Sequence, residues 1–216
     1  LANVDPNQVA SLLQRLGAAH EQLGDHDAAI RALSSARDLS PSDLGVQAQL
    51  AQTYIAAQRF DEAGEVVDQA KLQRPDNLML SRLEAMTLSA QGEVGDAVEV
   101  LKGALEQHQE QPAAHVALAN LYSEPDQVDD AVEVLRDAET QFPNNTQVLF
   151  QLGAVLERGQ RYPQAEAAFR RVLEREPDDA QTLNYLGYML AERNERLDES
   201  VELIQRALEL DPDNGS

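Results

Sequence analysis

Small residues recur along this chain at an interval of 34 residues, and this period constrains the fold more than any other feature. The recurring positions hold only glycine or alanine, at Gly17, Ala51, Ala85, Ala119, Gly153 and Gly187. A second small residue follows twelve residues later in five units and thirteen later in the sixth, at Ala29, Ala63, Ala97, Ala131, Ala165 and Ser200. Proline closes five units, at Pro41, Pro75, Pro143, Pro177 and Pro212. A fixed period of this length predicts an array of similar structural units.

The spacing within each unit predicts two antiparallel helices. Small residues let the two helix backbones approach, and larger apolar residues at helical intervals, such as Leu33, Leu101 and Phe169, fill the space between them. Proline ends the second helix. The composition agrees, because aromatic residues make up only 4% and tryptophan is absent. One hairpin cannot bury its apolar face alone, so we expect the units to stack.

These residues resemble the tetratricopeptide repeat family. The resemblance implies an all-α, right-handed solenoid of six helix-turn-helix repeats, at 10–43, 44–77, 78–111, 112–145, 146–179 and 180–214, preceded at 1–9 by the tail of another unit or an N-terminal cap. Two features depart from the family pattern: leucine replaces tryptophan near helix starts, as at Leu13, and Gln109 stands where the third unit should have proline. Neither departure argues against the fold.

The same resemblance implies a concave groove lined by the first helix of each repeat. The candidate partner-binding residues there are Gln14, Gln49, Gln52, Met79, Arg82, Met86, Asn120, Gln147, Phe150, Gln151, Asn184, Tyr185 and Tyr188. Such a groove is rich in amides and nearly neutral, with aromatic anchors of the kind common in protein interfaces. The aromatic residues have a second interpretation, in which Phe150 and Tyr185 pack between neighbouring first helices.

The charge balance makes nucleic acid an unexpected partner. Acidic residues number 38 against 17 basic ones, which gives a net charge of −21, so a phosphate backbone would be repelled. The acidic surface serves either solvation or recognition of a basic partner. Only Lys71 and Lys102 are lysines, and both fall on second helices, which disfavours the lysine clamp for C-terminal carboxylates that some members of the family use.

The sequence predicts neither an enzyme nor a cofactor or metal site. Cysteine is absent, and so are phosphate-binding glycine loops, nucleophile elbows and His-Glu-x-x-His motifs. No apolar run is long enough to insert into a membrane. The stretch Gly24-Asp25-His26-Asp27 could begin a metal site, but its equivalents in the other units favour a turn, in which His26 packs between the helices and Asp27 caps or starts the second helix.

One residue breaks the apolar pattern of the first helices. Glu84 occupies a position where the other units have leucine, as at Leu50 and Leu152. A buried carboxylate needs a partner. We expect either a structural irregularity with such a partner or a functional break in the groove.

The last helix carries apolar residues that no following helix would cover. Val201, Ile204 and Leu208 are therefore candidates for self-association. The alternative is that the chain is a fragment of a longer array.

We therefore expect a non-catalytic protein-interaction scaffold that binds an extended or helical segment of a partner protein. The alternatives are a self-associating structural module and the regulatory arm of a larger enzyme. The last unit resembles bacterial cell-envelope proteins of this family, including lipoprotein adaptors, so a periplasmic or outer-membrane-anchored adaptor is the alternative to a cytoplasmic scaffold.

Overall fold

A computed structural model describes residues 5–122 and 127–211, and helices are the regular secondary structure within these ranges. The chain divides into two compact units, residues 1–108 (unit 1) and 109–216 (unit 2). The prediction of an all-α fold is confirmed. Each unit is described below by itself.

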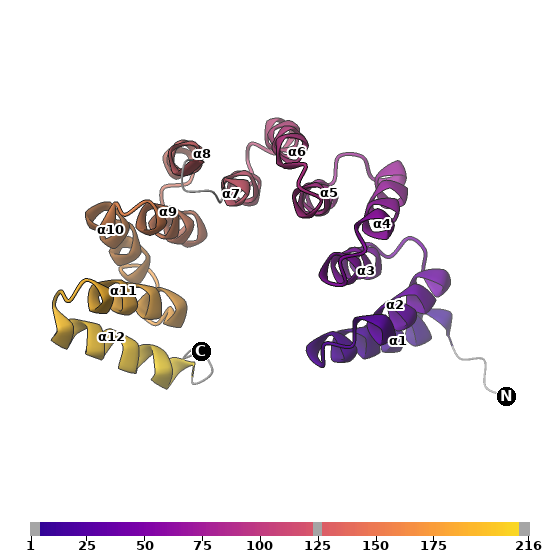
Figure 1. Cartoon of the computed structure of the whole chain (residues 1–216), viewed down its shortest axis with the longest axis horizontal. Coiled ribbons are helices and arrows are strands. Elements are labelled where there is room, and N and C mark those ends of the chain that lie inside the picture. Colours follow the sequence, from indigo (N-terminus) through magenta and orange to yellow (C-terminus); the bar gives the residue numbers. More distant parts are fainter. Residues whose placement is uncertain (1–4, 123–126, 212–216) are drawn as a thin grey trace. The chain divides into compact units, whose positions relative to one another are not determined.

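Unit 1 consists of three helical hairpins (Figure 1). Its helices are α1 (Pro6–Gln22), α2 (His26–Leu39), α3 (Leu44–Ala56), α4 (Phe60–Gln73), α5 (Leu78–Ala90) and α6 (Val94–Gln107). The two helices of each hairpin pack together, α2 packs against α3, and α4 packs against α5. The first helices α3 and α5 also contact each other. Each hairpin thus buries its apolar face against the next one, as the period predicts.

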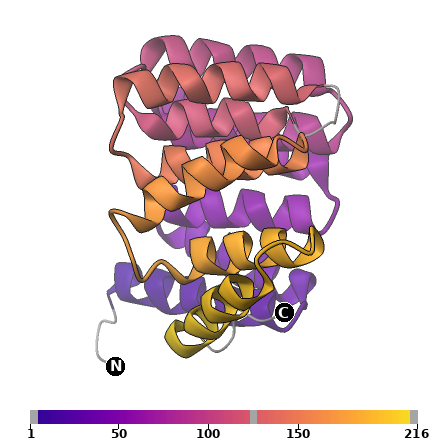
Figure 2. The same cartoon turned by 90° about the vertical axis from the view of Figure 1, so that its left-hand side faces the viewer.

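Unit 2 repeats this arrangement among its described residues. Its helices are α7 (Pro112–Leu121), α8 (Val128–Gln141), α9 (Thr146–Arg158), α10 (Tyr162–Leu173), α11 (Ala180–Glu192) and α12 (Leu197–Leu210). Each pair α7–α8, α9–α10 and α11–α12 forms a hairpin, and α8 packs on α9 as α10 does on α11. Figure 2 shows helices of this unit from the side.

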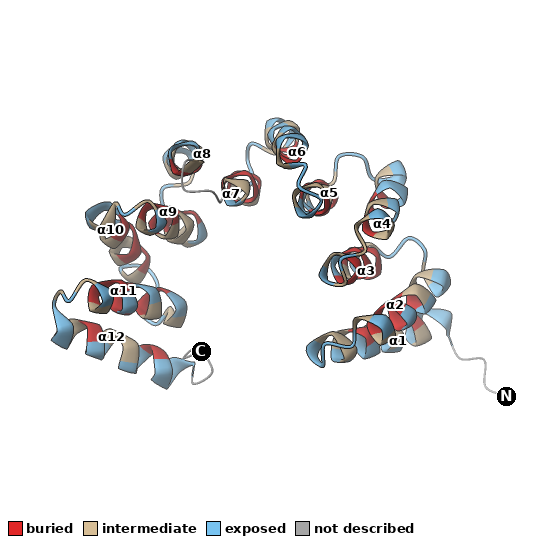
Figure 3. Cartoon of the chain, in the orientation of Figure 1, coloured by how far each residue is buried: buried red, intermediate tan, exposed pale blue. Residues whose placement is uncertain are grey.

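The recurring small residues lie where the two helices of a hairpin meet. All six first-helix positions are buried, and so are all six second-helix positions. A methyl group on Gly153 would lie 2.6 Å from Phe169 Cε1, so only glycine leaves room for this ring. At Ser200 the buried hydroxyl donates a 2.8 Å hydrogen bond to the Gly187 carbonyl oxygen. The buried residues in Figure 3 mark these contact faces.

Each described turn within a hairpin begins with the same backbone geometry, and the last one has a second left-handed residue at Arg196. A residue with positive φ recurs every 34 residues, at Gly24, Gln58, Gly92, Gln160 and Asn194. The next residue donates its N–H to a carbonyl five residues earlier, as from Asp25 to His20 at 2.9 Å. This is the Schellman ending of a helix, which requires a left-handed residue at that point. The equivalent residue 126 lies outside the described ranges.

Aspartate or asparagine caps most first helices. The side chains of Asp43, Asn77, Asn145 and Asp179 accept hydrogen bonds from backbone N–H groups in the first turn. Asp5 caps α1, which therefore begins at Pro6 and not at residue 10, where we expected the first repeat to begin. Residues 6–9 belong to α1, whereas residues 1–4 and Pro212 lie outside the described ranges.

Candidate protein-binding surface

All thirteen candidate groove residues lie on the first helices of the hairpins, and none of them is buried. Six belong to unit 1 and seven to unit 2. On α5, Met79, Arg82 and Met86 follow at intervals of three and four residues, which places them along one side of the helix. Met79 is 38% exposed and Met86 is 43% exposed. Together with half-buried Gln49 and Gln14, they make the unit 1 surface a mixture of thioether and amide groups.

The aromatic candidates of unit 2 connect the core to the surface. Phe150 on α9 is half-buried, and its ring lies 5.8 Å from that of fully buried Phe169 and 5.2 Å from that of Tyr185 on α11. The Phe150–Tyr185 pair is edge-on, with an interplanar angle of 80°, a favourable aromatic geometry. Tyr185 remains 43% exposed and Tyr188 remains 47% exposed. Phe150 therefore packs among these rings. Tyr185 also packs against Phe150 and Phe169 and, like Tyr188, keeps less than half of its surface exposed.

Three of the four amide candidates of unit 2 lie on the same helices as these rings. Gln147 and Gln151 flank Phe150 on α9, and half-buried Asn184 precedes Tyr185 on α11. Asn120 is exposed on α7. Amides can both donate and accept hydrogen bonds, so a peptide backbone could pair with them.

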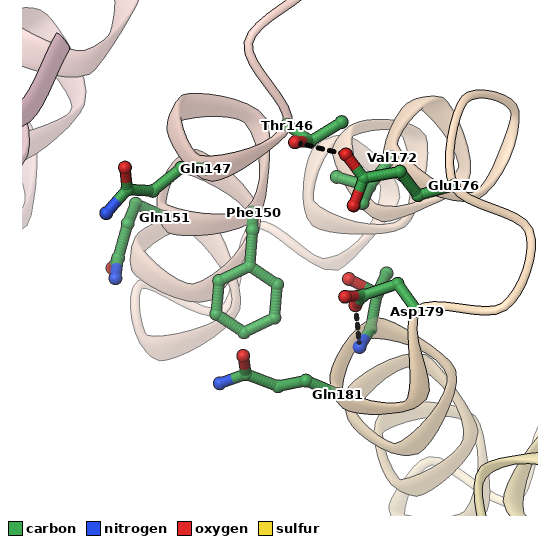
Figure 4. Close-up of a pocket in the computed structure, with 9 residues that line it drawn as sticks. Thr146, Gln147, Phe150, Gln151, Val172, Glu176, Asp179 and Gln181 are labelled. Atoms are coloured by element: carbon green, nitrogen blue, oxygen red, sulfur yellow. Dashed lines mark hydrogen bonds between the residues drawn. The ribbon is translucent and has the colours of Figure 1, made fainter. Parts of the chain in front are cut away.

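A cavity of about 280 Å³ opens beside Phe150, entirely within unit 2 (Figure 4). Its walls come from α9, α10, α11 and the segment that joins the last two. The lining residues are Thr146, Gln147, Phe150, Gln151, Val172, Glu176, Asp179, Gln181 and Thr182. Of these, only Gln147, Phe150 and Gln151 were among the predicted site residues. Glu176 and Asp179 were missed because they lie in the segment before α11, and Val172 and Thr182 because they are buried.

The arginine side chains of unit 2 pair with groups outside the candidate binding surface. In the described part of this unit, all nine arginines donate a hydrogen bond to a partner within the chain, mostly on second helices and turns. Arg170 and Arg196 both pair with Glu166, and Arg136 and Arg171 both pair with Glu139. The candidate surface of this unit is therefore neutral to acidic.

These pairings shift the pKa values of two glutamates. At Glu166, the hydrogen bond from Arg196 is the largest cause and lowers the pKa below its ordinary value, with partial burial opposing it and Arg170 adding to it. At Glu139, partial burial opposes ionisation most strongly, but hydrogen bonds from Arg171 and Arg136 outweigh it, so the pKa is again lowered. Glu157 on α9 shows the opposite shift, because burial and the nearby charge of Glu192 raise its pKa.

The stretch from Gly24 to Asp27 forms a turn. Gly24 takes a φ of 72°, and His26 is the first residue of α2, with its Nδ1 3.1 Å from Glu21 Oε1. Asp25 caps the helix by accepting a 3.0 Å hydrogen bond from the Ala28 N–H, whereas Asp27 lies in the first turn. The prediction for Asp27 is therefore right about the start of the helix and wrong about the cap. Among the described residues no three His, Asp or Glu side chains cluster as a metal site would.

Glu84 has the partner that its position requires. It is half-buried on α5 and pairs with Lys71 of α4. The leucines at the equivalent position of other repeats, Leu50, Leu118 and Leu152, are at most 3% exposed. Pairing with a neighbouring helix is the structural irregularity that we expected as one of two alternatives, and it places Lys71, like Lys102, on a second helix.

The self-association candidates occupy different environments on α12. Val201 is 52% exposed and Leu208 is 39% exposed. Ile204 is half-buried against α11, where a methyl group on Gly187 would lie 2.7 Å from Ile204 Cγ1. Of the three candidates, Val201 and Leu208 thus present apolar side chains to solvent, as Leu197 and Leu210 do on the same helix. No helix in the described ranges combines the length and apolar character of a membrane span.

Comparison with known proteins identifies relatives of the whole array. The chain is 30% identical over 204 residues to the TPR repeat-containing protein PA4667 of Pseudomonas aeruginosa, an alignment that covers 91% of this chain and 29% of that protein. The chain thus spans less than a third of the length of this relative.

Solved structures share the fold at lower identity. The protein TTC0263 of Thermus thermophilus, described as a thermophilic TPR protein, superposes with a TM-score of 0.66 at 21% identity and covers 84% of this chain and 99% of its own. PilF of Pseudomonas aeruginosa gives 0.59 at 18% identity and covers 98% and 95%. YrrB, described as a TPR protein with an unusual peptide-binding site, gives 0.52 at 19% identity and covers 85% and 94%.

Family models of the tetratricopeptide repeat match residues 20–86, 88–139 and 150–215, which together span most of the chain. The matched segments contain all but the first of the small residues that recur every 34 positions and all of the described left-handed turns. The chain therefore belongs to the tetratricopeptide repeat family.

Proposed function

We propose that this chain is a non-catalytic scaffold that binds an extended or helical segment of a partner protein along the exposed sides of its first helices. The family and the fold support a protein-interaction role in general. The finer proposal rests on one observation. Tyr185 and Tyr188 are 43% and 47% exposed on α11, beside amide side chains, while the described arginines of unit 2 are paired elsewhere.

The physical argument concerns what such a surface can recognise. Exposed tyrosines offer large, rigid apolar area with a polar end, and they lose little conformational entropy on binding. The adjacent amides can pair with a peptide backbone. A partner segment would therefore place apolar side chains against the tyrosines and its backbone along the amides. The peptide-binding site that names YrrB supports this role for the fold.

The test is capture of partner proteins from a bacterial lysate by the immobilised chain, followed by peptide mapping. Tyr188→Ala removes an exposed ring that has no aromatic contact in the described part of the structure, so it should leave the fold intact. We expect captured proteins to fall by about tenfold, as for truncation of a binding anchor. Glu133→Ala on the exposed side of α8 is the matched control. Equal capture by wild type and Tyr188→Ala would reject this surface.

A self-associating module is the second candidate, because Val201 and Leu208 expose apolar side chains on α12. Sedimentation velocity over a hundredfold concentration range tests it. If the module self-associates through this helix, Val201→Glu/Leu208→Glu will abolish a concentration-dependent dimer, whereas Glu202→Gln on the same helix will not. A monomer at all concentrations rejects this candidate.

A further inference from the structure

The cavity beside Phe150 contains a buried polar atom without a partner. Thr182 is fully buried at the start of α11 and lines the cavity, and its Oγ1 has no hydrogen-bond partner among the described residues. A buried hydroxyl without a partner is unfavourable, so native structures rarely leave one. The backbone N–H of the same residue is satisfied by Asp179 Oδ1 at 2.7 Å. The hydroxyl has no accessible surface in this structure, so a group in the cavity would reach it only by displacing part of the cavity wall.

Two carboxylates of the cavity lack a cation. Glu176 accepts a 2.8 Å hydrogen bond from Thr146 Oγ1, and Asp179 caps α11, but neither forms an ion pair within the described ranges. The adjacent arginines are directed elsewhere. Arg175 donates to Asn144 and to the Arg171 carbonyl oxygen, and Arg206 pairs with Asp178. The cavity therefore keeps two negative charges at its edge while its neighbours are neutralised.

The remaining walls are mainly aromatic and amide, with aliphatic Val172 and the threonines beside them. Figure 4 shows the Phe150 ring and the Gln181 amide at one side of the cavity, with Glu176 and Asp179 at the other. An aromatic face attracts a cation, most often a guanidinium. Amide oxygens, carboxylates and a hydroxyl oxygen all accept hydrogen bonds.

We propose that this cavity is a subsite for an arginine side chain of the bound partner segment. The proposal deepens the proposed function and rests on it for the source of the arginine. A guanidinium carries five N–H donors in a plane, so it can lie against Phe150 while donating to Glu176 and Asp179. A lysine ammonium is compact and strongly hydrated and would satisfy fewer of these acceptors. The subsite also assigns a recognition role to part of the chain's acidity.

The experiment uses the full chain and a single-residue probe, so that it does not depend on any partner. Nα-acetyl-arginine N-methylamide is titrated into the isotope-labelled protein at about 150 mM salt, where exposed charges are screened beyond about 8 Å. We expect saturable amide shifts confined to residues 146–151 and 176–182. The citrulline analogue has the same shape without the charge and should bind at least about tenfold more weakly, because charge-assisted hydrogen bonds are about twice as strong as neutral ones.

One variant and one control locate the effect. Glu176→Gln should weaken binding of the arginine probe by about fivefold or more, since it removes the negative charge of an acceptor and leaves a neutral amide. Glu174→Gln makes the same charge change at an exposed residue outside the cavity and should leave binding unchanged. Circular dichroism and melting curves verify that every variant is folded. Asp179 is left unchanged because it caps α11.

Three results would overturn the inference: equal binding of the arginine and citrulline probes, shifts spread over acidic turns throughout the chain, or equal behaviour of Glu176→Gln and Glu174→Gln. The outcomes separate the two proposals. If the arginine probe does not bind while Tyr188→Ala still captures fewer proteins than wild type, the arginine subsite is rejected and the proposed binding surface is supported. If the probe binds as expected while Tyr188→Ala captures as much as wild type, the subsite is supported and the proposed binding surface is rejected.

Discussion

At the residue scale, the packing of α9 against α10 depends on the absence of one methyl group. At Gly153, an added Cβ would lie 2.6 Å and 2.8 Å from two atoms of the Phe169 ring, which is fully buried and contacts Phe150. Gly103 on α6 has no atom within 4 Å of its added Cβ. The two glycines are therefore a matched pair, one required by packing and one not.

We expect Gly153→Ala to lower the free energy of unfolding by about 1–3 kcal/mol, as overpacking does in a filled core. Gly103→Ala should raise it by about 0.5–1 kcal/mol, because alanine favours an exposed helix over glycine. Urea denaturation followed by circular dichroism measures both. Stabilisation by both substitutions would show that the Phe169 ring can move away, and would contradict the packing argument.

Some features of single residues could be predicted from the sequence, and others could not. The spacing of Gly153 and Ala165 predicted a contact between helices, since small residues at helical intervals have few other uses. The same period carries a left-handed residue at Gln58 and Gln160, with φ of 59° and 58°. Glutamine does not signal this conformation, so only the structure identifies it. The burial of the Thr182 hydroxyl without a partner is a tertiary feature and could not be predicted from local sequence.

At the element scale, ion pairs connect consecutive hairpins of unit 2. Glu166 on α10 accepts hydrogen bonds from Arg170 on the same helix and from Arg196 at the start of α12. The Arg170 guanidinium also pairs with Glu199 on α12 at 2.6 Å. The helix positions could be predicted from the 34-residue period. The pairs between hairpins could not, because they join side chains about 30 residues apart. With 38 acidic residues in the chain, the sequence does not identify which carboxylate pairs with a given arginine.

We expect Glu166→Gln to destabilise the fold by about 1 kcal/mol at pH 7, the scale of a partly exposed ion pair that belongs to a network. Because the pKa of Glu166 is lowered in the folded state, the folded protein binds fewer protons there than the unfolded chain. Its contribution is therefore present above the ordinary glutamate pKa and is lost as the pH falls through the folded value. Urea denaturation between pH 7 and pH 3 should show the gap between wild type and Glu166→Gln closing on the acid side. Glu174→Gln is the control, and a constant gap would contradict the assignment.

At the scale of the whole molecule, two electrostatic effects oppose each other. The net charge of −21 disfavours any compact state through self-repulsion. The ion pairs around Glu139 and Glu166 favour the fold locally. Repulsion among like charges acts over long distances, whereas paired groups interact at contact, so salt weakens the repulsion more than the partly buried pairs.

We therefore expect sodium chloride to stabilise the chain. Between about 10 mM and 500 mM salt, the screening length falls from about 30 Å to less than 10 Å, and the melting temperature should rise by several degrees. Potassium chloride should act alike, since ionic strength and not the cation is the cause. The melting temperature of Glu166→Gln should rise more with salt than that of wild type. This variant lacks the ion pairs of Glu166, which salt weakens somewhat, but it retains the repulsion among the other acidic residues. A melting temperature that falls with salt would mean that the paired arginines, and not the excess of carboxylates, dominate the electrostatics of the fold.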